Sequence, residues 1–232
     1  MKRIMILIIF TIALFLSFIP VIMGRYQKEL PNERYLDLTV ILDAGHGGKD
    51  GGATSASGIV EKDLVLAVTE QVASHLRLQG INVILTRDGD YDLATPGAKR
   101  RKAEDLNKRV AIMNSQENGI AISIHANAIA NRRWKGPQTF YHPRQIENKQ
   151  LATAIMNSMQ TNLEGATRSS RAASNIFVLK HSEVPTALVE IGFLSNLEEA
   201  GRLNTEAYQA LVAYAIYEGI LYYLENPEMQ VD

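Results

Sequence analysis

The stretch Asp43-Ala44-Gly45-His46-Gly47-Gly48-Lys49-Asp50 directly follows the apolar run 39–42 (TVIL). The run predicts a buried strand, and the glycines predict a sharp turn at its carboxyl end that carries a histidine. Segments 123–127 (SIHAN) and 189–196 (VEIGFLSN) have the same form, with apolar residues followed by polar ones. In open α/β sheets, ligands and chemistry gather at the carboxyl ends of the parallel strands. We therefore expect His46, His125 and Glu190 to lie at one sheet edge.

These residue types indicate a metal site. Two histidines and a carboxylate suit a Zn²⁺ ion, with a fourth position left open for water and one further acidic residue free to act as a base. The same set also accepts other divalent metals. A phosphate-binding glycine loop is the alternative for the His46 segment, but the segment has neither Gly-x-Gly-x-x-Gly nor a Lys-Ser/Thr pair.

Each candidate also has a structural explanation. Glu61 begins an amphipathic segment just beyond the His46 loop, so its carboxylate can return to the sheet edge, but it could instead stabilise the start of a helix. His125 by itself could be a core histidine, and only the presence of His46 makes it a candidate ligand. Glu190 ends an apolar strand, where a carboxylate is costly unless it has a polar partner.

Apolar strand-like runs alternate with amphipathic helical patterns from residue 38 onward. This alternation predicts the fold class α/β, a single three-layer domain with a mostly parallel central sheet covered by helices on both faces. The folded domain is expected to cover residues 38–225, and residues 226–232 a tail. The predicted strands are 38–43, 81–86, 120–124, 138–141, 175–179 and 186–191, and the predicted helices are 61–79, 103–116, 146–163 and 205–224.

Composition excludes several classes of function. The 232 residues carry a formal net charge of −1, so no polyanionic partner is indicated and we expect no binding to nucleic acid. The chain has no cysteine, which excludes disulfides, thiolate metal sites and cysteine nucleophiles. Hydrophobic residues make up 46% of the chain, enough for a substantial core.

The N-terminal segment predicts a membrane anchor. Lys2 and Arg3 precede an apolar stretch, residues 4–23, which as a helix would be ~30 Å long, about the thickness of a bilayer core. We interpret residues 1–24 as an uncleaved signal anchor and residues 25–37 as a linker. A cleaved signal peptide is the alternative, although no Ala-x-Ala precedes Gly24. In either case the folded domain is expected outside the cytoplasm.

Several other polar residues have two interpretations each. Asp43 and Asp50 flank His46 and could orient it from behind, or could simply form turns. Arg87 and Arg109 are expected to stabilise the fold rather than to act in catalysis. Trp134 lies in a polar loop after His125, where it could stack on a sugar face or serve only for packing.

The chain resembles the zinc-dependent N-acetylmuramoyl-L-alanine amidases, a family often called amidase type 3. The resemblance spans roughly residues 38–224, and it implies that His46, Glu61 and His125 bind zinc and that Glu190 is the catalytic glutamate. It also implies a peptidoglycan substrate, in which the amide between the lactyl group of N-acetylmuramic acid and L-alanine is cleaved. The matching motifs are DAGHGGKDGGA at 43–53, EKD at 61–63, Leu106, Arg109 and Asn114, SIHANA at 123–128 and EIGFLSN at 190–196.

Within the family, the anchor-plus-domain layout and residues 100–106 (RRKAEDL) are similar to the membrane-anchored spore-cortex amidases. That similarity implies a role in forming muramic-δ-lactam, a location between the forespore membranes, and possible dependence on a lipoprotein activator. Two other functions stay open: another zinc hydrolase, such as a stem-peptide carboxypeptidase, or a non-catalytic wall-binding protein.

Overall fold

A mixed β-sheet forms the centre of the molecule in the computed structural model, which describes Tyr35 and residues 37–231. Within these residues the strand order is β2-β1-β3-β6-β4-β5. Strands β2, β1, β3 and β6 are parallel to one another, whereas β4 is antiparallel to β6 and β5 follows the direction of β4. The bounds are β1 Thr39–Ala44, β2 Asn82–Leu85, β3 Gly119–Asn127, β4 Gln138–Tyr141, β5 Arg171–Ala172 and β6 Thr186–Phe193.

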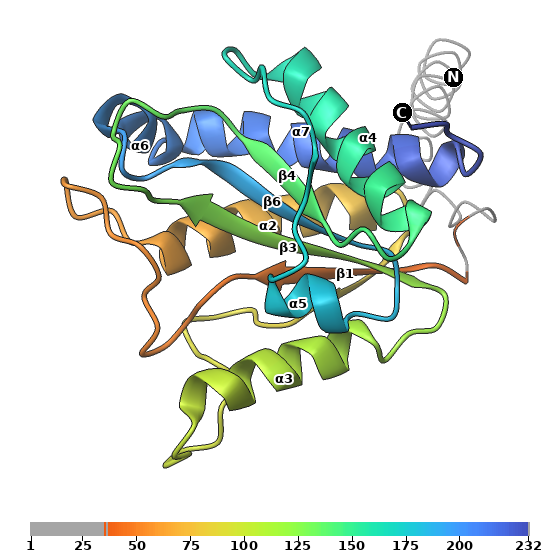
Figure 1. The fold of residues 1–232 in the computed structure, drawn as a ribbon, viewed down its shortest axis with the longest axis horizontal. Helices are drawn as coiled ribbons and strands as arrows, with labels where there is room; N and C mark the ends of the chain where they lie inside the picture. The colour runs from red at the N-terminus through yellow and green to blue at the C-terminus, as the bar shows by residue number, and fades with distance from the viewer. Residues whose placement is uncertain (1–34, 36, 232) are drawn as a thin grey trace, which may run out of the picture.

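Helices cover both faces of this sheet, as Figure 1 shows. One face packs against α2, α4 and α7, and the other against α3 and α5. The short helix α6 follows β6 at the end of the sheet. The three-layer α/β architecture is therefore confirmed. The bounds are α2 Glu61–Leu78, α3 Arg101–Met113, α4 Ile146–Asn162, α5 Phe177–His181, α6 Leu197–Leu203 and α7 Glu206–Glu225.

The buried strand β1 shows why the sequence reads as a continuous apolar run. Val40 and Leu42 belong to the core formed with α2, α4 and α7, whereas Ile41 between them belongs to the core formed with α3 and α5. Because successive side chains of a strand point to opposite faces, a strand covered on both sides must be apolar at every position.

The parallel register brings the polar strand ends together. Asp43 of β1 is level with Ser123 of β3, and His125 of β3 is level with Glu190 of β6. An irregularity in the β3–β6 register falls between His125 and Asn127. The carboxyl edge of β1, β3 and β6 therefore carries the predicted site residues.

One prediction of the fold needs correction. The sheet is mostly parallel, as predicted, and it is mixed because β4 runs antiparallel to β6. The strand predicted at 175–179 is the helix α5, because a short apolar run does not distinguish a strand from a buried helical turn. Its residues Val178 and Leu179 fill the core on the α3 side. Strand β5 and helix α6 were not predicted.

The predicted anchor, residues 1–24, and nearly all of the predicted linker, 25–37, lie outside the described residues. In the part of the chain that is described, no helix combines the length and the apolar character needed to cross a membrane.

Candidate metal centre

The loop after β1 presents His46 in an unusual backbone conformation. His46 has a φ of 61°, in the left-handed region that residues other than glycine rarely adopt. Two buried arginines hold this loop from behind. Arg109 donates to the carbonyl oxygens of Ala44 and His46, and Arg87 donates to those of Ala44 and Gly45. The arginines thus act on the backbone of the loop, in agreement with their predicted role in the fold.

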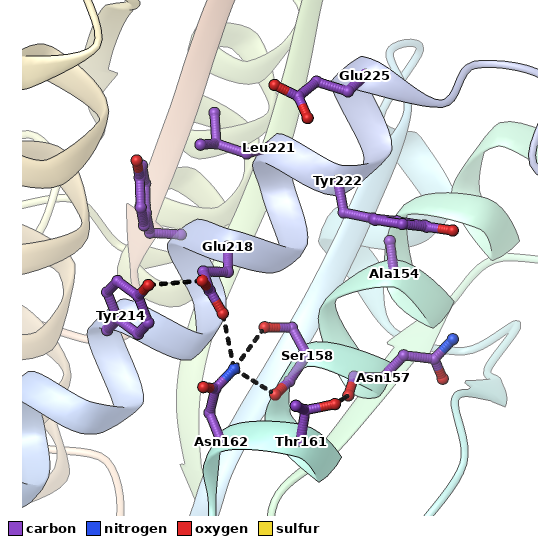
Figure 2. A pocket seen from close by; sticks show the side chains of 11 residues that line it. Ala154, Asn157, Ser158, Thr161, Asn162, Tyr214, Glu218, Leu221, Tyr222 and Glu225 are labelled. Atoms are coloured by element: carbon purple, nitrogen blue, oxygen red, sulfur yellow. Dashed lines mark hydrogen bonds between the residues drawn. The ribbon is translucent and has the colours of Figure 1, made fainter.

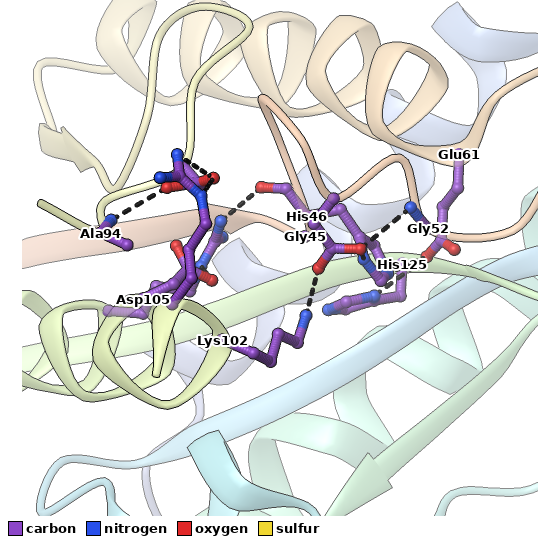
Figure 3. Close-up of polar contacts among 12 residues, drawn as sticks. Gly45, His46, Gly52, Glu61, Ala94, Lys102, Asp105 and His125 are labelled. Atoms are coloured by element: carbon purple, nitrogen blue, oxygen red, sulfur yellow. Dashed lines mark hydrogen bonds and ion pairs between the residues drawn. The ribbon is translucent and has the colours of Figure 1, made fainter. Parts of the chain in front are cut away.

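His46, Glu61 and His125 form one cluster, although they come from three separate elements (Figure 3). His46 Nε2 lies 3.1 Å from Glu61 Oε1, and His125 Nδ1 lies 3.0 Å from the same oxygen. The candidate donor atoms all lie within 4.8 Å of one another. The structure therefore brings together the three residues predicted as ligands.

Glu61 is held as a carboxylate at the first turn of α2. Its Oε2 accepts a hydrogen bond from the Ala53 backbone N–H at 2.8 Å, and its Oε1 accepts one from Ala126 N–H at 3.0 Å. Burial acts to raise the pKa of Glu61, but the contacts with His125 and His46 outweigh it and hold the pKa well below its usual value. Glu61 is a poor proton acceptor for this reason, and a good anionic ligand.

Asp50 lies behind His46, as one of its two interpretations predicted. Its Oδ1 is 3.0 Å from His46 Nδ1, but the alignment is poor, and that nitrogen has no hydrogen bond of good geometry. Its Oδ2 forms an ion pair with the ammonium group of Lys102 of α3. Burial opposes the shift, yet Lys102 and His46 lower the pKa of Asp50 to about 2. Asp50 thus gives His46 an anionic partner on the side away from the cluster.

Asp43 does not contact the His46 ring. It is buried and pairs with Arg109 Nη1 at 2.7 Å, and it accepts hydrogen bonds from Ser123 Oγ at 2.6 Å and Thr86 Oγ1 at 2.7 Å. Burial acts to raise its pKa, but Arg109 and the two hydroxyl groups lower it overall. Asp43 therefore acts on His46 only through Arg109, which holds the backbone of the loop.

Glu190 has a different environment from Glu61. Its Oε2 is buried and has no hydrogen-bond partner among the described residues. Burial raises the pKa of Glu190 to about 7, and the nearby Glu61 carboxylate adds to this effect while His125 opposes it. An unpartnered buried carboxylate oxygen is costly, so it points to a missing polar group at this place. Glu190 beside the cluster is thus equipped to accept a proton.

Asp43, His46, His125 and Glu190 line a cleft of about 290 Å³ whose other walls come from α3 and α5. Lys102 and Leu106 form the α3 wall, and Ile176, Phe177 and Val178 form the α5 wall. Sequence reasoning did not find either wall, because α5 was assigned to a strand and Lys102 approaches only through tertiary packing. A possible signal for Lys102 was its helical spacing, four residues before Leu106.

A larger groove, of about 590 Å³, lies between α4 and α7 (Figure 2). It contains no histidine, and its Glu218 is occupied by hydrogen bonds from Tyr214 and Asn162. Trp134 lines neither space: it is 46% exposed, and Arg168 stacks over its ring at 4.6 Å. The chemistry therefore belongs to the smaller cleft.

The donor set fits a bound metal ion. Two imidazoles and one carboxylate are the protein ligands that catalytic metal sites commonly use with an open fourth position, and the unpartnered Glu190 oxygen faces the same cleft. An α/β domain with this cluster at the carboxyl edge of its parallel strands is typical of metal-dependent hydrolases.

Comparison with known proteins identifies the family. The profile of the N-acetylmuramoyl-L-alanine amidases matches residues 40–222, and the chain belongs to this family. It is 45% identical over 187 residues to the germination-specific N-acetylmuramoyl-L-alanine amidase of Bacillus subtilis, covering 79% of this chain and 78% of that protein. The protein is thus an enzyme that hydrolyses the muramoyl-alanine amide of peptidoglycan.

Solved structures agree with this assignment. The CwlD amidase of Clostridioides difficile, in a complex with the GerS lipoprotein, is 36% identical with a TM-score of 0.77, over 81% of this chain and 98% of that one. The amidase AmiC2 of Nostoc punctiforme is 34% identical with a TM-score of 0.71, over 82% and 98% of the two chains.

Proposed function

We propose that this amidase acts on spore-cortex peptidoglycan, where it removes the stem peptide from muramic acid as the first step toward muramic-δ-lactam. The similarity to a germination-specific amidase and to CwlD supports this assignment. We further propose that His46, Glu61 and His125 hold a Zn²⁺ ion and that Glu190 is the general base. The observation that carries the site assignment is the His46–Glu61–His125 cluster next to the unpartnered Oε2 of Glu190.

The environments of the two glutamates support their different roles. Glu61 has both oxygens held by backbone N–H groups and a lowered pKa, as suits a ligand. Glu190 has a raised pKa and a free oxygen, as suits a base. Two carboxylates with pKa values pushed in opposite directions are a common sign of divided roles in an active site.

In the proposed mechanism, bound zinc would supply the Lewis acidity that lowers the pKa of a water molecule and polarises the substrate carbonyl. Glu190 accepts the proton of the attacking water, and it then returns this proton to the nitrogen of the departing L-alanine. During this cycle Asp50 holds His46 at its ring Nδ1, and Arg109 holds it at its backbone carbonyl oxygen.

Location and partner follow from the same reasoning and are also proposals. Residues 1–24 would anchor the chain in the cell membrane with the catalytic domain outside the cytoplasm, in a spore former between the two forespore membranes. The lipoprotein bound to the Clostridioides difficile CwlD supports a lipoprotein activator for this chain. Activity of the zinc-loaded full chain, measured with and without such a partner, tests this dependence.

Mass spectrometry of digested peptidoglycan tests the proposed reaction. The full chain should release intact stem peptides with a free L-alanine amino group and leave peptide-free muramic acid on the glycan. Release of single terminal amino acids would instead identify a carboxypeptidase, and binding without any product would identify a wall-binding protein. The cortex role is tested by expression in a spore former that lacks its own enzyme, where muramic-δ-lactam should reappear; its absence would refute that role.

A further inference from the structure

We propose that Lys102 is a specificity-determining residue that binds a carboxylate of the stem peptide in the catalytic cleft. This inference rests on the proposed function, because it concerns the substrate of the same site. The ligand chemistry is that of an acidic peptide, specifically the free α-carboxylate of the γ-linked glutamate that follows L-alanine in the stem. The alternative form of this residue, with the carboxylate converted to an amide, would be bound more weakly.

Lys102 lies in the first turn of α3 and reaches toward the loop that carries His46 (Figure 3). It lines the same cleft as His46, His125 and Glu190. Its side chain is 56% exposed, so solvent and substrate can both approach the ammonium group. The substrate carboxylate belongs to the second residue of the stem, so it lies ~7 Å from the scissile bond, about the length of two extended residues.

Lys102 has hydrogen-bonding capacity that the fold does not use. A lysine ammonium has three N–H donors, and the contact to Asp50 Oδ2 occupies one of them. The other cation that lines the cleft is Arg109, which is 2% exposed and donates through all three of its nitrogens to Asp105, to Asp43 and to backbone carbonyls. Of these two cations, only Lys102 is available to an anionic ligand.

The acidic side chains near the cleft would repel a substrate carboxylate unless a cation such as Lys102 offset them. Glu190 lines the cleft, and Glu61 and Asp50 contact the histidines that line it, so a substrate carboxylate that enters meets acidic side chains. The wall residues Leu106, Ile176 and Phe177 are apolar and offer no compensation. Lys102 can offset this repulsion, and its contact with Asp50 holds the flexible side chain in place before substrate arrives.

The test compares two synthetic muramyl peptides that differ only in a carboxylate or an amide at the second residue. With the zinc-loaded full chain, we expect a KM about 5- to 10-fold lower for the carboxylate form and a similar kcat for both, as for one charge-assisted contact at a partly exposed site. Lys102→Met should raise the KM of the carboxylate form until it equals the KM of the amide form. Lys102→Arg, which keeps the positive charge, should keep the preference for the carboxylate form. Lys108→Ala is the matched control, because Lys108 lies on the same helix, pairs with Glu104 and does not line the cleft.

A binding measurement separates this inference from the proposed function. Calorimetry with the Glu190→Gln full chain should show the same preference for the carboxylate form, and Glu190→Gln/Lys102→Met should show none. If the wild type cleaves neither peptide, with or without the lipoprotein partner, the proposed reaction fails whatever the binding preference. If the wild type cleaves both forms equally well, or if Lys102→Met keeps the preference while its zinc content and circular dichroism match the wild type, the role of Lys102 is refuted.

Discussion

Replacing Gly45 by alanine tests the geometry of the metal site without altering a ligand. A Cβ atom at residue 45 would lie 2.6 Å from each ring nitrogen of His125 and closer still to its Cε1. Non-bonded heavy atoms rest at ~3.5 Å, so the His125 ring must move by ~1 Å. The ring has little freedom to do so, because Glu61 contacts its Nδ1 and the His46 ring packs edge-on against it at 5.0 Å between centroids.

The effect on zinc affinity should be large. Metal–ligand distances tolerate deviations of ~0.2 Å, and a ~1 Å shift of His125 is about five times that. Loss of groups that merely orient a ligand weakens metal binding ~10–100-fold, so displacing the ligand itself should weaken it by more than ~100-fold. Overpacking at Gly45 should also cost about 1–3 kcal/mol of folding stability. Competition of the full chain with a zinc chelator measures the affinity, and urea denaturation measures the stability.

Gly201→Ala is the control for this substitution. Residue 201 lies in α6, and a Cβ there meets no atom within 4 Å. The same chemical change should therefore leave zinc affinity unaltered and stabilise the protein by up to ~1 kcal/mol. Wild-type zinc affinity in a folded Gly45→Ala protein would refute the account of how His125 is held.

Three further outcomes are expected. Asp43→Ala should destabilise the protein by about 3–5 kcal/mol in urea denaturation at pH 7, because it removes one of the two carboxylates that pair with the buried Arg109 and leaves the Ser123 and Thr86 hydroxyl groups without their acceptor. Because the fold lowers the pKa of Asp43 from 3.8, the stabilisation by Asp43 is complete above that pH and declines as the pH falls further. The difference in unfolding free energy between wild type and variant should therefore narrow in acid, and a difference that stays constant with pH would contradict this. Asp50→Asn should weaken zinc binding ~10–100-fold in chelator competition, and an unchanged affinity would show that Asp50 does not support His46. Free zinc at 100 times its dissociation constant should stabilise the full chain by ~2.7 kcal/mol, and a melting temperature independent of zinc would argue against a site in the folded state.

Hydrophobic periodicity correctly predicted the long helices that bury one face in the core. In α2 the residues at helical spacing, Leu64, Val68, Val72 and Leu76, are all buried, and the helix predicted at 205–224 is capped by Thr205, whose side chain accepts a hydrogen bond from the Tyr208 N–H. The apolar run at 176–179 was misassigned because its burial depends on packing against α3 and β6, which local sequence does not encode. The sequence left the direction of β4 undetermined, because only its pairing with β6 defines it.

The site was predictable where strand ends determine it. His46 follows β1, and His125 and Glu190 lie level with each other in the carboxyl-terminal halves of β3 and β6, so sheet topology places them near one edge. Glu61 could be placed at the site only if the loop after His46 returns to that edge. The hydrogen bond from the Ala53 N–H to Glu61 Oε2 shows that the loop does so. Lys102 could not be assigned a role, because its position in the cleft depends on how α3 packs on the sheet.

The division of roles between ligand and base is the central claim, and Glu190→Gln tests it most directly. Zinc content and kcat should be measured on the same preparation of the full chain with a muramyl-peptide substrate. The account predicts wild-type zinc content and a rate lower by ~10²–10⁴-fold, the usual contribution of a positioned general base. A variant that keeps most of its activity, or one that loses its zinc, would contradict the account.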